Sequence, residues 1–589
     1  MRKTLAAFLV VAGTLGAPQL ASAAGTMAFT DCGLEDGFQC ARLFVPTDWT
    51  SPSTTKQIGL YVERKAGATQ PATTALIALA GGPGQSATPF AESFAQLLAP
   101  ALGTRDLIVY DQRGTGRSGY LTCPFAERTA SDNNEFSAQC ATELGPTRIN
   151  YSTRDTVDDI EAIRQALGVD KVSIFGVSYG TYVAQLYARR YPTHTESLIL
   201  DSVVPPTGVD PFDRTSFRAI KAELVKLCAG GRCRGITKSA LADATKLAAQ
   251  AERAGIPFTL INPIDGRPLT LRMGSTLFFT LFEQGLAFDE VSRARLPAAL
   301  ASSLRGDSYP LGQIVGSLIG PAASEDDSTA MSDALNLATF CTDTTFPWAS
   351  VDSLSTRLAK TTTSLNALSS DGFLPFPRSA VLAAGTFNEC LAWPSTDAVT
   401  VPSAVPDVPV LVLSGRDDML TPYEDAVTVA KQYPRSVVVR VPNTGHSVVT
   451  TAPGAAGICV ETALTRFFAG QPVADCPDAP ASVPPTPLDP TRLAALRPTG
   501  AKGLAGRTAT AALATLDDSL LTLFSRETLT GLRGGTMRGT TSDFTLSNVV
   551  FVPGVVVSGS VDWESGMAQL RVSGKGARGS LQVVRGVGV

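Results

Sequence analysis

A serine and two histidines are the residues of this chain whose types and spacing most clearly suggest chemistry. Ser178 lies in the pentapeptide GVSYG (176–180), which fits the pattern G-x-S-x-G. That pattern is typical of a nucleophilic serine on a sharp turn between a strand and a helix. Because so short a pattern also arises by chance, its meaning depends on a base, an acid and the surrounding elements.

A nucleophilic serine needs a general base, and the chain contains only two histidines, His194 and His446. His194 follows a helix end, ARRYP, where an imidazole can simply lie near the negative helix terminus. His446 lies in the loop NTGHS (443–447), just after the apolar run SVVVRVP. Catalytic groups of open α/β sheets gather in loops at strand ends, so the sequence favours His446 as the base.

The acid that orients the histidine is expected between the serine and the histidine in chain order. The apolar run VPVLVLSG (408–415) is followed by RDDMLTP, which contains the adjacent residues Asp417 and Asp418. Spacing alone does not separate these two aspartates.

The elements around these residues alternate between strands and helices. Ser178 itself stands between the apolar run KVSIFG and the helical stretch YGTYVAQLYARRY. Short apolar runs bounded by turn residues predict buried strands, and a period near 3.6 predicts helices. This alternation predicts a parallel sheet with crossover helices. The expected strands are 57–63, 73–80, 106–111, 171–176, 197–201, 408–415 and 436–442.

The alternation divides the chain into domains. A first core part (24–204) precedes 200 mainly helical residues (205–404), and a second core part (405–478) follows. An insertion of this size between two halves of one sheet is interpreted as a cap over its active edge. A proline-rich linker (479–490) then precedes alternating segments that predict a small β-rich module (491–589).

The composition limits the classes of partner. The length of 589 residues predicts two or more domains, and the balance of 44% apolar to 17% charged residues indicates a globular and not a disordered protein. A net charge of −4 provides no global attraction to nucleic acid or to an anionic membrane. No stretch after the N-terminus is apolar and long enough for a membrane-spanning helix.

The N-terminus indicates export. Arg2 and Lys3 precede the apolar run LAAFLVVAG, and Ala21-Ser22-Ala23 forms a small-x-small cleavage site. This arrangement predicts a secretory signal peptide over residues 1–23, rather than a buried helix, and a secreted or periplasmic mature protein.

Ten cysteines suit an oxidising compartment and are expected to form disulfides. Sequence does not fix their connectivity, but pairing of neighbours is the simplest hypothesis. A zinc site is disfavoured because the chain has no C-x-x-C and few histidines. The neighbouring pairs are Cys32 with Cys40, Cys123 with Cys140, Cys228 with Cys233, Cys341 with Cys390, and Cys459 with Cys476.

Several motifs together resemble one family. They are GGPG (81–84), DQRGTGRS (111–118), the Ser178 pentapeptide, Asp418 with Thr421-Pro422, Gly445-His446, and the cysteine contexts at 32–40, 390 and 459–476. Over residues 30–478 the chain resembles the prolyl-iminopeptidase and secreted tripeptidyl-aminopeptidase family of α/β-hydrolases. Ala80 departs from the family pattern, which commonly has histidine there, and the C-terminal module lies outside the resemblance.

The resemblance implies an α/β-hydrolase that releases residues from the free N-terminus of peptides, without a metal or organic cofactor. It matches the acid to Asp418, which gives a catalytic triad of Ser178, Asp418 and His446. Backbone N–H groups of Tyr179 and Gly82 are expected to form the oxyanion hole, because Pro83 has no N–H to donate.

An enzyme that acts at a free N-terminus must also recognise an ammonium group. Asp343 and Glu389 are the predicted partners, because each lies close to one cysteine of the pair Cys341 and Cys390. Two other interpretations remain open at this point. The same triad serves a secreted esterase or lipase, and a non-catalytic binding protein can share the fold.

Overall fold

The computed structural model describes residues 27–584, except 35–36, 53–55, 131, 209, 320–328, 386, 395–403, 482, 524–527, 540–542, 563 and 575–576. The predicted signal peptide, residues 1–23, lies outside the described residues. Within the described part of the chain, no helix is long and apolar enough to cross a membrane.

A nine-stranded sheet forms the centre of the catalytic core, in the order β1-β2-β3-β5-β4-β6-β7-β10-β11. Strands β1 to β3 and β5 pair antiparallel, and the pairs from β5 through β4 to β11 are parallel. Every residue of β10 is buried, as expected for a parallel strand covered on both faces. The strands are β1 (Thr30–Asp31), β2 (Gln39–Pro46), β3 (Gln57–Lys65), β4 (Thr74–Leu79), β5 (Arg105–Tyr110), β6 (Lys171–Val177), β7 (Thr195–Asp201), β10 (Val410–Gly415) and β11 (Ser436–Val441).

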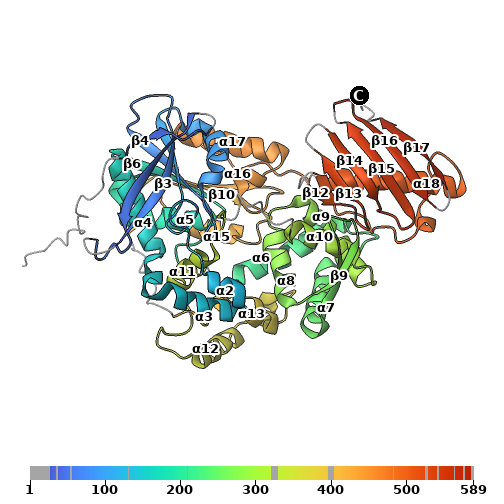
Figure 1. Cartoon of the computed structure of the whole chain (residues 1–589), viewed down its shortest axis with the longest axis horizontal. Helices are drawn as coiled ribbons and strands as arrows, with labels where there is room; N and C mark the ends of the chain where they lie inside the picture. The colour runs from blue at the N-terminus through green and yellow to red at the C-terminus, as the bar shows by residue number, and fades with distance from the viewer. Residues whose placement is uncertain are drawn as a thin grey trace, which may run out of the picture.

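Helices cover both faces of this sheet (Figure 1). Helices α4 (Thr153–Leu167), α5 (Tyr179–Arg190) and α15 (Tyr423–Ala430) bury their apolar sides in one core. On the opposite face α1 (Ala91–Leu97), α16 (Val448–Thr451) and α17 (Gly454–Phe468) share a second core. This three-layer arrangement is that of an α/β-hydrolase sheet, as the family resemblance implied, but the sheet is mixed and not wholly parallel because β1 to β3 extend it antiparallel.

Between β7 and β10 the chain leaves the sheet and forms the cap. Its aromatic core contains Phe217, Phe278, Phe282 and Phe376. Two helices that precede the insertion, α2 (Pro124–Thr129) and α3 (Asn133–Leu144), pack into the same core through Cys123 and Cys140. The cap elements are α6 (Arg214–Leu227), α7 (Ala240–Ala254), β8 (Ile256–Ile261), β9 (Pro268–Met273), α8 (Ser275–Thr280), a π-helical turn (Leu281–Gly285), α9 (Glu290–Ser303), α10 (Tyr309–Ile319), α11 (Asp333–Asp343), α12 (Leu354–Asn366), α13 (Arg378–Ala384) and α14 (Phe387–Cys390).

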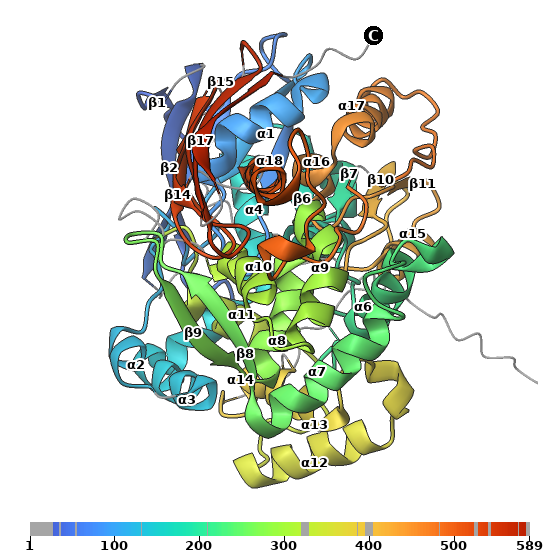
Figure 2. The same ribbon diagram turned by 90° about the vertical axis from the view of Figure 1, so that its right-hand side faces the viewer.

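The C-terminal module consists of one helix, α18 (Gly503–Leu523), and a six-stranded antiparallel sheet. Helix α18 covers one face of that sheet, where Ala511 and Leu516 pack with Phe544 and Leu570. The module lies against the cap near α9 and α10 (Figures 1 and 2). Its strands are β12 (Thr528–Thr530), β13 (Thr536–Gly539), β14 (Asp543–Val549), β15 (Val555–Asp562), β16 (Met567–Gly574) and β17 (Arg578–Val584).

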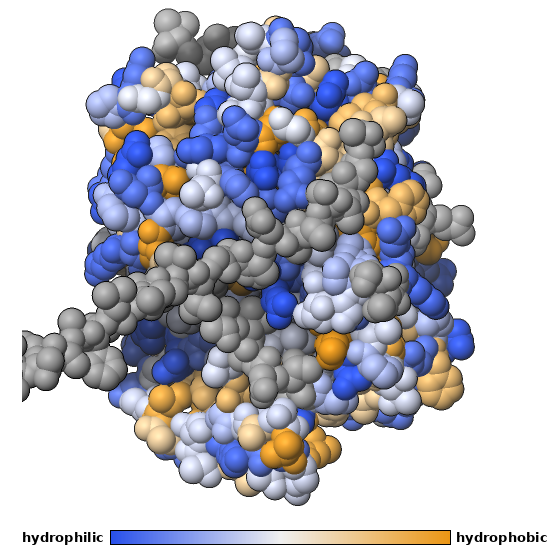
Figure 3. All heavy atoms as spheres, turned by 90° about the vertical axis from the view of Figure 1, so that its left-hand side faces the viewer, coloured by the Kyte–Doolittle hydropathy of each residue, from blue (hydrophilic) through white to orange (hydrophobic). Residues whose placement is uncertain are grey.

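Five disulfides join the cysteine neighbours that the spacing suggested. The bridge Cys123–Cys140 joins α2 to α3, and Cys341–Cys390 joins α11 to α14. One bridge therefore joins two helices of the cap, and another joins the two earlier helices that pack into the cap core. On the face of the molecule shown in Figure 3, apolar side chains form small scattered patches, as on an ordinary protein surface.

Candidate active site

Ser178 occupies a strained turn between β6 and α5. Its backbone has φ 54° and ψ −122°, a conformation that L-residues rarely adopt. The turn is possible because glycines flank it: a Cβ at Gly176 would lie 2.4 Å from the Gly180 carbonyl oxygen, and one at Gly180 would lie 2.6 Å from the Ala80 carbonyl oxygen. The Ser178 N–H donates to the Asp201 carbonyl at 2.9 Å, which ties the turn to the end of β7.

Asp418 and His446 meet at the carboxyl edge of the neighbouring strands β10 and β11. His446 Nδ1 lies 2.9 Å from Asp418 Oδ2 and 3.1 Å from Thr421 Oγ1, and both Asp418 and His446 are buried. Asp418 Oδ1 also accepts hydrogen bonds from the backbone N–H groups of Leu420 and Thr421, each at 2.9 Å. The Thr421 hydroxyl donates to Asp418 Oδ2 at 2.8 Å, so that four donors in all hold the aspartate in one orientation toward the imidazole.

The electrostatics of this pair favour an ionised carboxylate. Burial alone would raise the pKa of Asp418, but His446 and the hydrogen bonds from Thr421 outweigh it, so that this pKa lies below its usual value. The neighbouring Asp417 forms an ion pair with Lys226 of α6 instead. Of the two adjacent aspartates, Asp418 is therefore the one that contacts the histidine.

Ser178 and His446 lie at the same edge of the sheet but form no hydrogen bond with each other in the part of the chain described. In enzymes without bound substrate such contacts are often long, and they tighten in the complex with substrate. The Nδ1 atom of the other histidine, His194, lies 3.1 Å from Glu161 Oε1, and its ring stacks on Tyr191. These contacts indicate a structural role for His194.

The glycine loop lies beside Ser178. A Cβ at Gly81 would lie 3.2 Å from Ser178 Cβ, and Gly82 has φ +103°, which favours glycine. Asp111 holds the following turn by accepting hydrogen bonds from the N–H groups of Ala87 and Thr88 at 3.1 and 3.0 Å. The backbones of Gly82 and Tyr179 are thus near the serine. Their N–H groups are the ones that the sequence analysis predicts for the oxyanion hole.

A cavity of about 1170 Å³ separates the sheet edge from the cap, and Ser178, Tyr179 and Gly82 line it. The described residues around it include seven carboxylic acids but only two arginines. Arg214 already pairs with one of these acids, at 2.5 Å from Asp210. The cavity is therefore strongly acidic. Its acids are Asp210, Asp213, Asp333, Asp343, Asp425, Glu283 and Glu389, and its arginines are Arg214 and Arg218.

Both predicted amine-binding residues line this cavity. Asp343, at the end of α11, accepts hydrogen bonds from the N–H and the hydroxyl of Thr153, while its Oδ1 is buried without a hydrogen-bond partner. Burial raises the pKa of Asp343 to about 7. Glu389 of α14 accepts from Asn133 at 3.4 Å, and burial also raises its pKa.

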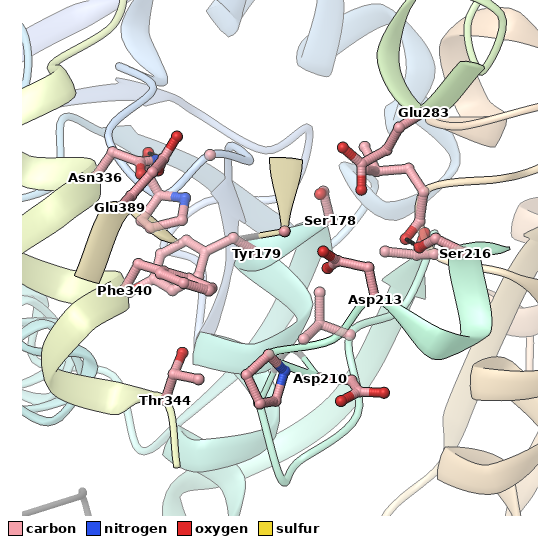
Figure 4. Close-up of a pocket in the computed structure, with 18 of the residues that line it drawn as sticks. Ser178, Tyr179, Asp210, Asp213, Ser216, Glu283, Asn336, Phe340, Thr344 and Glu389 are labelled. Atoms are coloured by element: carbon pink, nitrogen blue, oxygen red, sulfur yellow. Dashed lines mark hydrogen bonds between the residues drawn. The ribbon is translucent and has the colours of Figure 1, made fainter. Parts of the chain in front are cut away.

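Sequence reasoning missed two further acids beside the serine. Figure 4 shows Asp213 and Glu283 on one side of Ser178 and Glu389 on the other. Asp213 has a left-handed backbone, with φ 48°, and Glu283 lies in the π-helical turn. Burial, and then repulsion from Asp213 and Glu389, hold the pKa of Glu283 well above its usual value. Neither backbone feature has a clear sequence signal, although π turns often mark functional sites.

Two family models match the chain. Residues 74–218 match a model described as alpha/beta hydrolase fold, and residues 375–475 match one described as TAP-like protein. The first match contains Ser178, and the second contains Asp418 and His446.

Curated relatives agree with these matches. A tripeptidyl aminopeptidase of Streptomyces coelicolor is 25% identical over 77% of this chain and 85% of its own length. Serine protease Hip1 of Mycobacterium tuberculosis is 29% identical over 30% of this chain and 38% of its own. A proline iminopeptidase of Neisseria gonorrhoeae is 31% identical over 22% of this chain and 32% of its own. These comparisons confirm the predicted resemblance and the α/β-hydrolase fold. They also confirm the prediction that the chain is a serine peptidase.

Proposed function

We propose that this chain, a serine peptidase of the tripeptidyl-aminopeptidase and prolyl-iminopeptidase family of α/β-hydrolases, is an exported aminopeptidase. It releases short N-terminal pieces, tripeptides or single residues, from peptides with a free N-terminus. The observation that carries this proposal is the acidic cavity above Ser178, at the edge of the sheet where Asp418 meets His446.

The triad performs acyl transfer in two halves. Asp418 accepts from His446 Nδ1–H, which leaves Nε2 free to take the proton of Ser178 as its Oγ attacks the scissile carbonyl. The resulting oxyanion is stabilised by the N–H groups of Tyr179 and Gly82; removal of one such donor typically costs about 3 kcal/mol. His446 then protonates the leaving amine, and a water activated by the same histidine hydrolyses the acyl-enzyme.

The acids of the cavity supply the preference for a free N-terminus. An ammonium group that leaves bulk water needs a charge-assisted partner, and a buried carboxylate is a stronger one than a carboxylate on an open surface. Asp343 and Glu389 come from α11 and α14, which the Cys341–Cys390 disulfide joins. We propose these two residues as the amine site.

The same cavity disfavours the esterase or lipase alternative. A fatty acyl chain would have to lie against polar side chains such as Asp213 and Glu283, which line the space next to the serine. An apolar chain would remove water from these polar groups and offer them no hydrogen bond in return, which is costly. A peptide with positive charge at its N-terminus suits the site better.

Export is supported by two observations. Residues 1–23 have the pattern of a signal peptide, and all ten cysteines form disulfides, which persist in oxidising compartments. We therefore propose that the mature protein is secreted or periplasmic.

A panel of chromogenic amides tests the proposal. Purified mature protein is assayed on aminoacyl, dipeptidyl and tripeptidyl p-nitroanilides, each with a free and an acetylated N-terminus. We expect hydrolysis of free-amine substrates and much lower kcat/KM on their acetylated forms. Equal rates on both forms would reject the aminopeptidase and favour an endopeptidase or an esterase.

A further inference from the structure

Helix α9 of the cap contacts the loop that carries His446. Arg293, which is buried, donates to the carbonyl oxygens of Leu286 at 2.8 Å and of Asn443 at 3.2 Å. One guanidinium thus bridges the segment that enters α9 and the loop that begins at Asn443. Its planar fork of donors suits this bridging role.

The histidine is also held directly by the segment before α9. The His446 N–H donates to the Ala287 carbonyl at 2.8 Å, and the Phe288 ring lies edge-on to the imidazole with centroids 5.2 Å apart. The approach is close: a Cβ at Gly445 would lie 1.8 Å from the Ala287 oxygen. Any shift of α9 therefore acts on His446 without an intervening flexible group.

The opposite side of α9 binds the C-terminal module. Arg295 donates to Asp518 Oδ1 at 2.7 Å and to Thr522 Oγ1 at 2.8 Å, both on α18. The side chains of Arg295 and Asp518 are only 12% and 8% exposed, so solvent screens this pair little. Residues two apart on a helix point about 200° away from each other, so Arg293 and Arg295 face opposite partners.

The linker (479–490) also contacts both α9 and the loop that carries His446. Thr486 N–H donates to the Ala294 carbonyl of α9 at 3.0 Å. Asn443, at the start of the histidine loop, donates through Nδ2 to the carbonyls of Ala479 and Pro480 at 3.1 and 2.9 Å. The chain that leaves the catalytic core thus runs past the histidine loop and along α9 before it reaches the module.

We infer that the C-terminal module positions His446 through α9, with Arg293 as the positioning residue and Arg295–Asp518 as the ion pair that joins α9 itself to α18. No described residue of the module lines the cavity, so the module contributes no group to the cavity wall. Its contribution is to fix α9, whose N-terminal side sets where the imidazole stands relative to Ser178. A misplacement of about 1 Å in such a geometry can cost about a hundredfold in rate. This inference rests on the proposed function.

The test breaks the Arg295–Asp518 ion pair in the full-length mature protein. Arg295→Met and the isosteric Asp518→Asn are compared with Arg571→Met, a matched change at an exposed arginine of β16 that has no ion pair among the described residues. The measurements are kcat and KM on a free-amine peptide amide, the labelling rate of Ser178 with a fluorophosphonate, and the melting temperature. We expect kcat and labelling to fall about tenfold in the first two variants, with KM changed less than twofold.

Further variants separate positioning from a general loss of structure. The double variant should be no slower than Arg295→Met alone, because that single change already removes the contact between Arg295 and Asp518. Arg295→Lys, which keeps the charge, should recover part of kcat. Arg571→Met should behave as the parent.

Three results would overturn the inference. One is a parent-like kcat and labelling rate in both Arg295→Met and Asp518→Asn. Another is a loss in which KM and melting temperature change in proportion to kcat. A third is a parent that neither reacts with the fluorophosphonate nor cleaves peptides, which would reject the proposed function as well; the first two would leave that function standing.

Discussion

At the scale of single residues, the proposed triad makes the sharpest claim. Ser178→Ala, His446→Ala and Asp418→Asn should each lower kcat by about four orders of magnitude while the melting temperature stays near that of the parent. Asp417→Asn should have a far smaller effect, because Asp417 pairs with Lys226 and not with His446. Steady-state kinetics on a free-amine amide provides the measurement. If Asp417→Asn lowers kcat as much as Asp418→Asn does, the assignment of Asp418 as the orienting acid is wrong.

Asp343 makes a second prediction at this scale. Its pKa of about 7 means that the folded state binds a proton more tightly than the unfolded state does. The stability that it contributes is present at low pH and is lost as pH rises through about 7, whereas its charge for binding an ammonium appears over the same range. Asp343→Asn should therefore raise the melting temperature at pH 8 by at least about 2 °C and weaken the use of free-amine peptides.

The control for this prediction is the same pair of measurements at pH 5, where Asp343 is protonated in the folded protein. There the variant should exceed the parent in melting temperature by less than at pH 8, because the loss of stability begins near the usual aspartate pKa of 3.8 and is complete only near pH 7. A stability difference that does not depend on pH would show that Asp343 remains ionised throughout.

At the scale of elements, the contact between the histidine loop and the segment before α9 leaves the least room for a larger side chain. Gly445→Ala places a Cβ 1.8 Å from the Ala287 oxygen, so the loop or the cap segment must move. We expect kcat to fall more than tenfold. Gly274→Ala is the control, since nothing lies within 4 Å of a Cβ there. Parent-like kinetics of Gly445→Ala would show that this contact does not determine the position of His446.

The elements also show what sequence could and could not predict. The parallel strands and Ser178 were predictable because buried parallel strands are continuous apolar runs and the turn between β6 and α5 requires Gly176 and Gly180. The antiparallel strands β1 and β2 were not among the expected strands. The choice of Asp418 over Asp417 needed the family resemblance, since adjacent residues have the same spacing. Asp213 and Glu283 were missed because an αL aspartate and a π turn depend on tertiary packing. The contact of α9 with the module was missed for the same reason.

At the scale of the whole molecule, the disulfides fasten the cap with unequal effect. Loop-closure entropy predicts about 4 kcal/mol for Cys341–Cys390, with a sequence separation of 49, and about 2 kcal/mol for Cys228–Cys233, with a separation of 5. Replacement of both cysteines by alanine should therefore lower the melting temperature more for Cys341–Cys390 than for Cys228–Cys233. A larger loss of melting temperature on removal of Cys228–Cys233 would contradict this order. It would show that the length of the closed loop does not determine how much each bridge stabilises the cap.

The central claim is that Ser178 releases short pieces from a free N-terminus, and one measurement tests it most directly. A peptide of about ten residues and its N-acetylated twin are incubated with the mature protein, and the products are identified by mass spectrometry. We predict short N-terminal fragments from the free peptide, almost none from the acetylated twin, and none from either with Ser178→Ala. Internal cleavage of both peptides at similar rates, or fragments that persist in Ser178→Ala, would contradict the account.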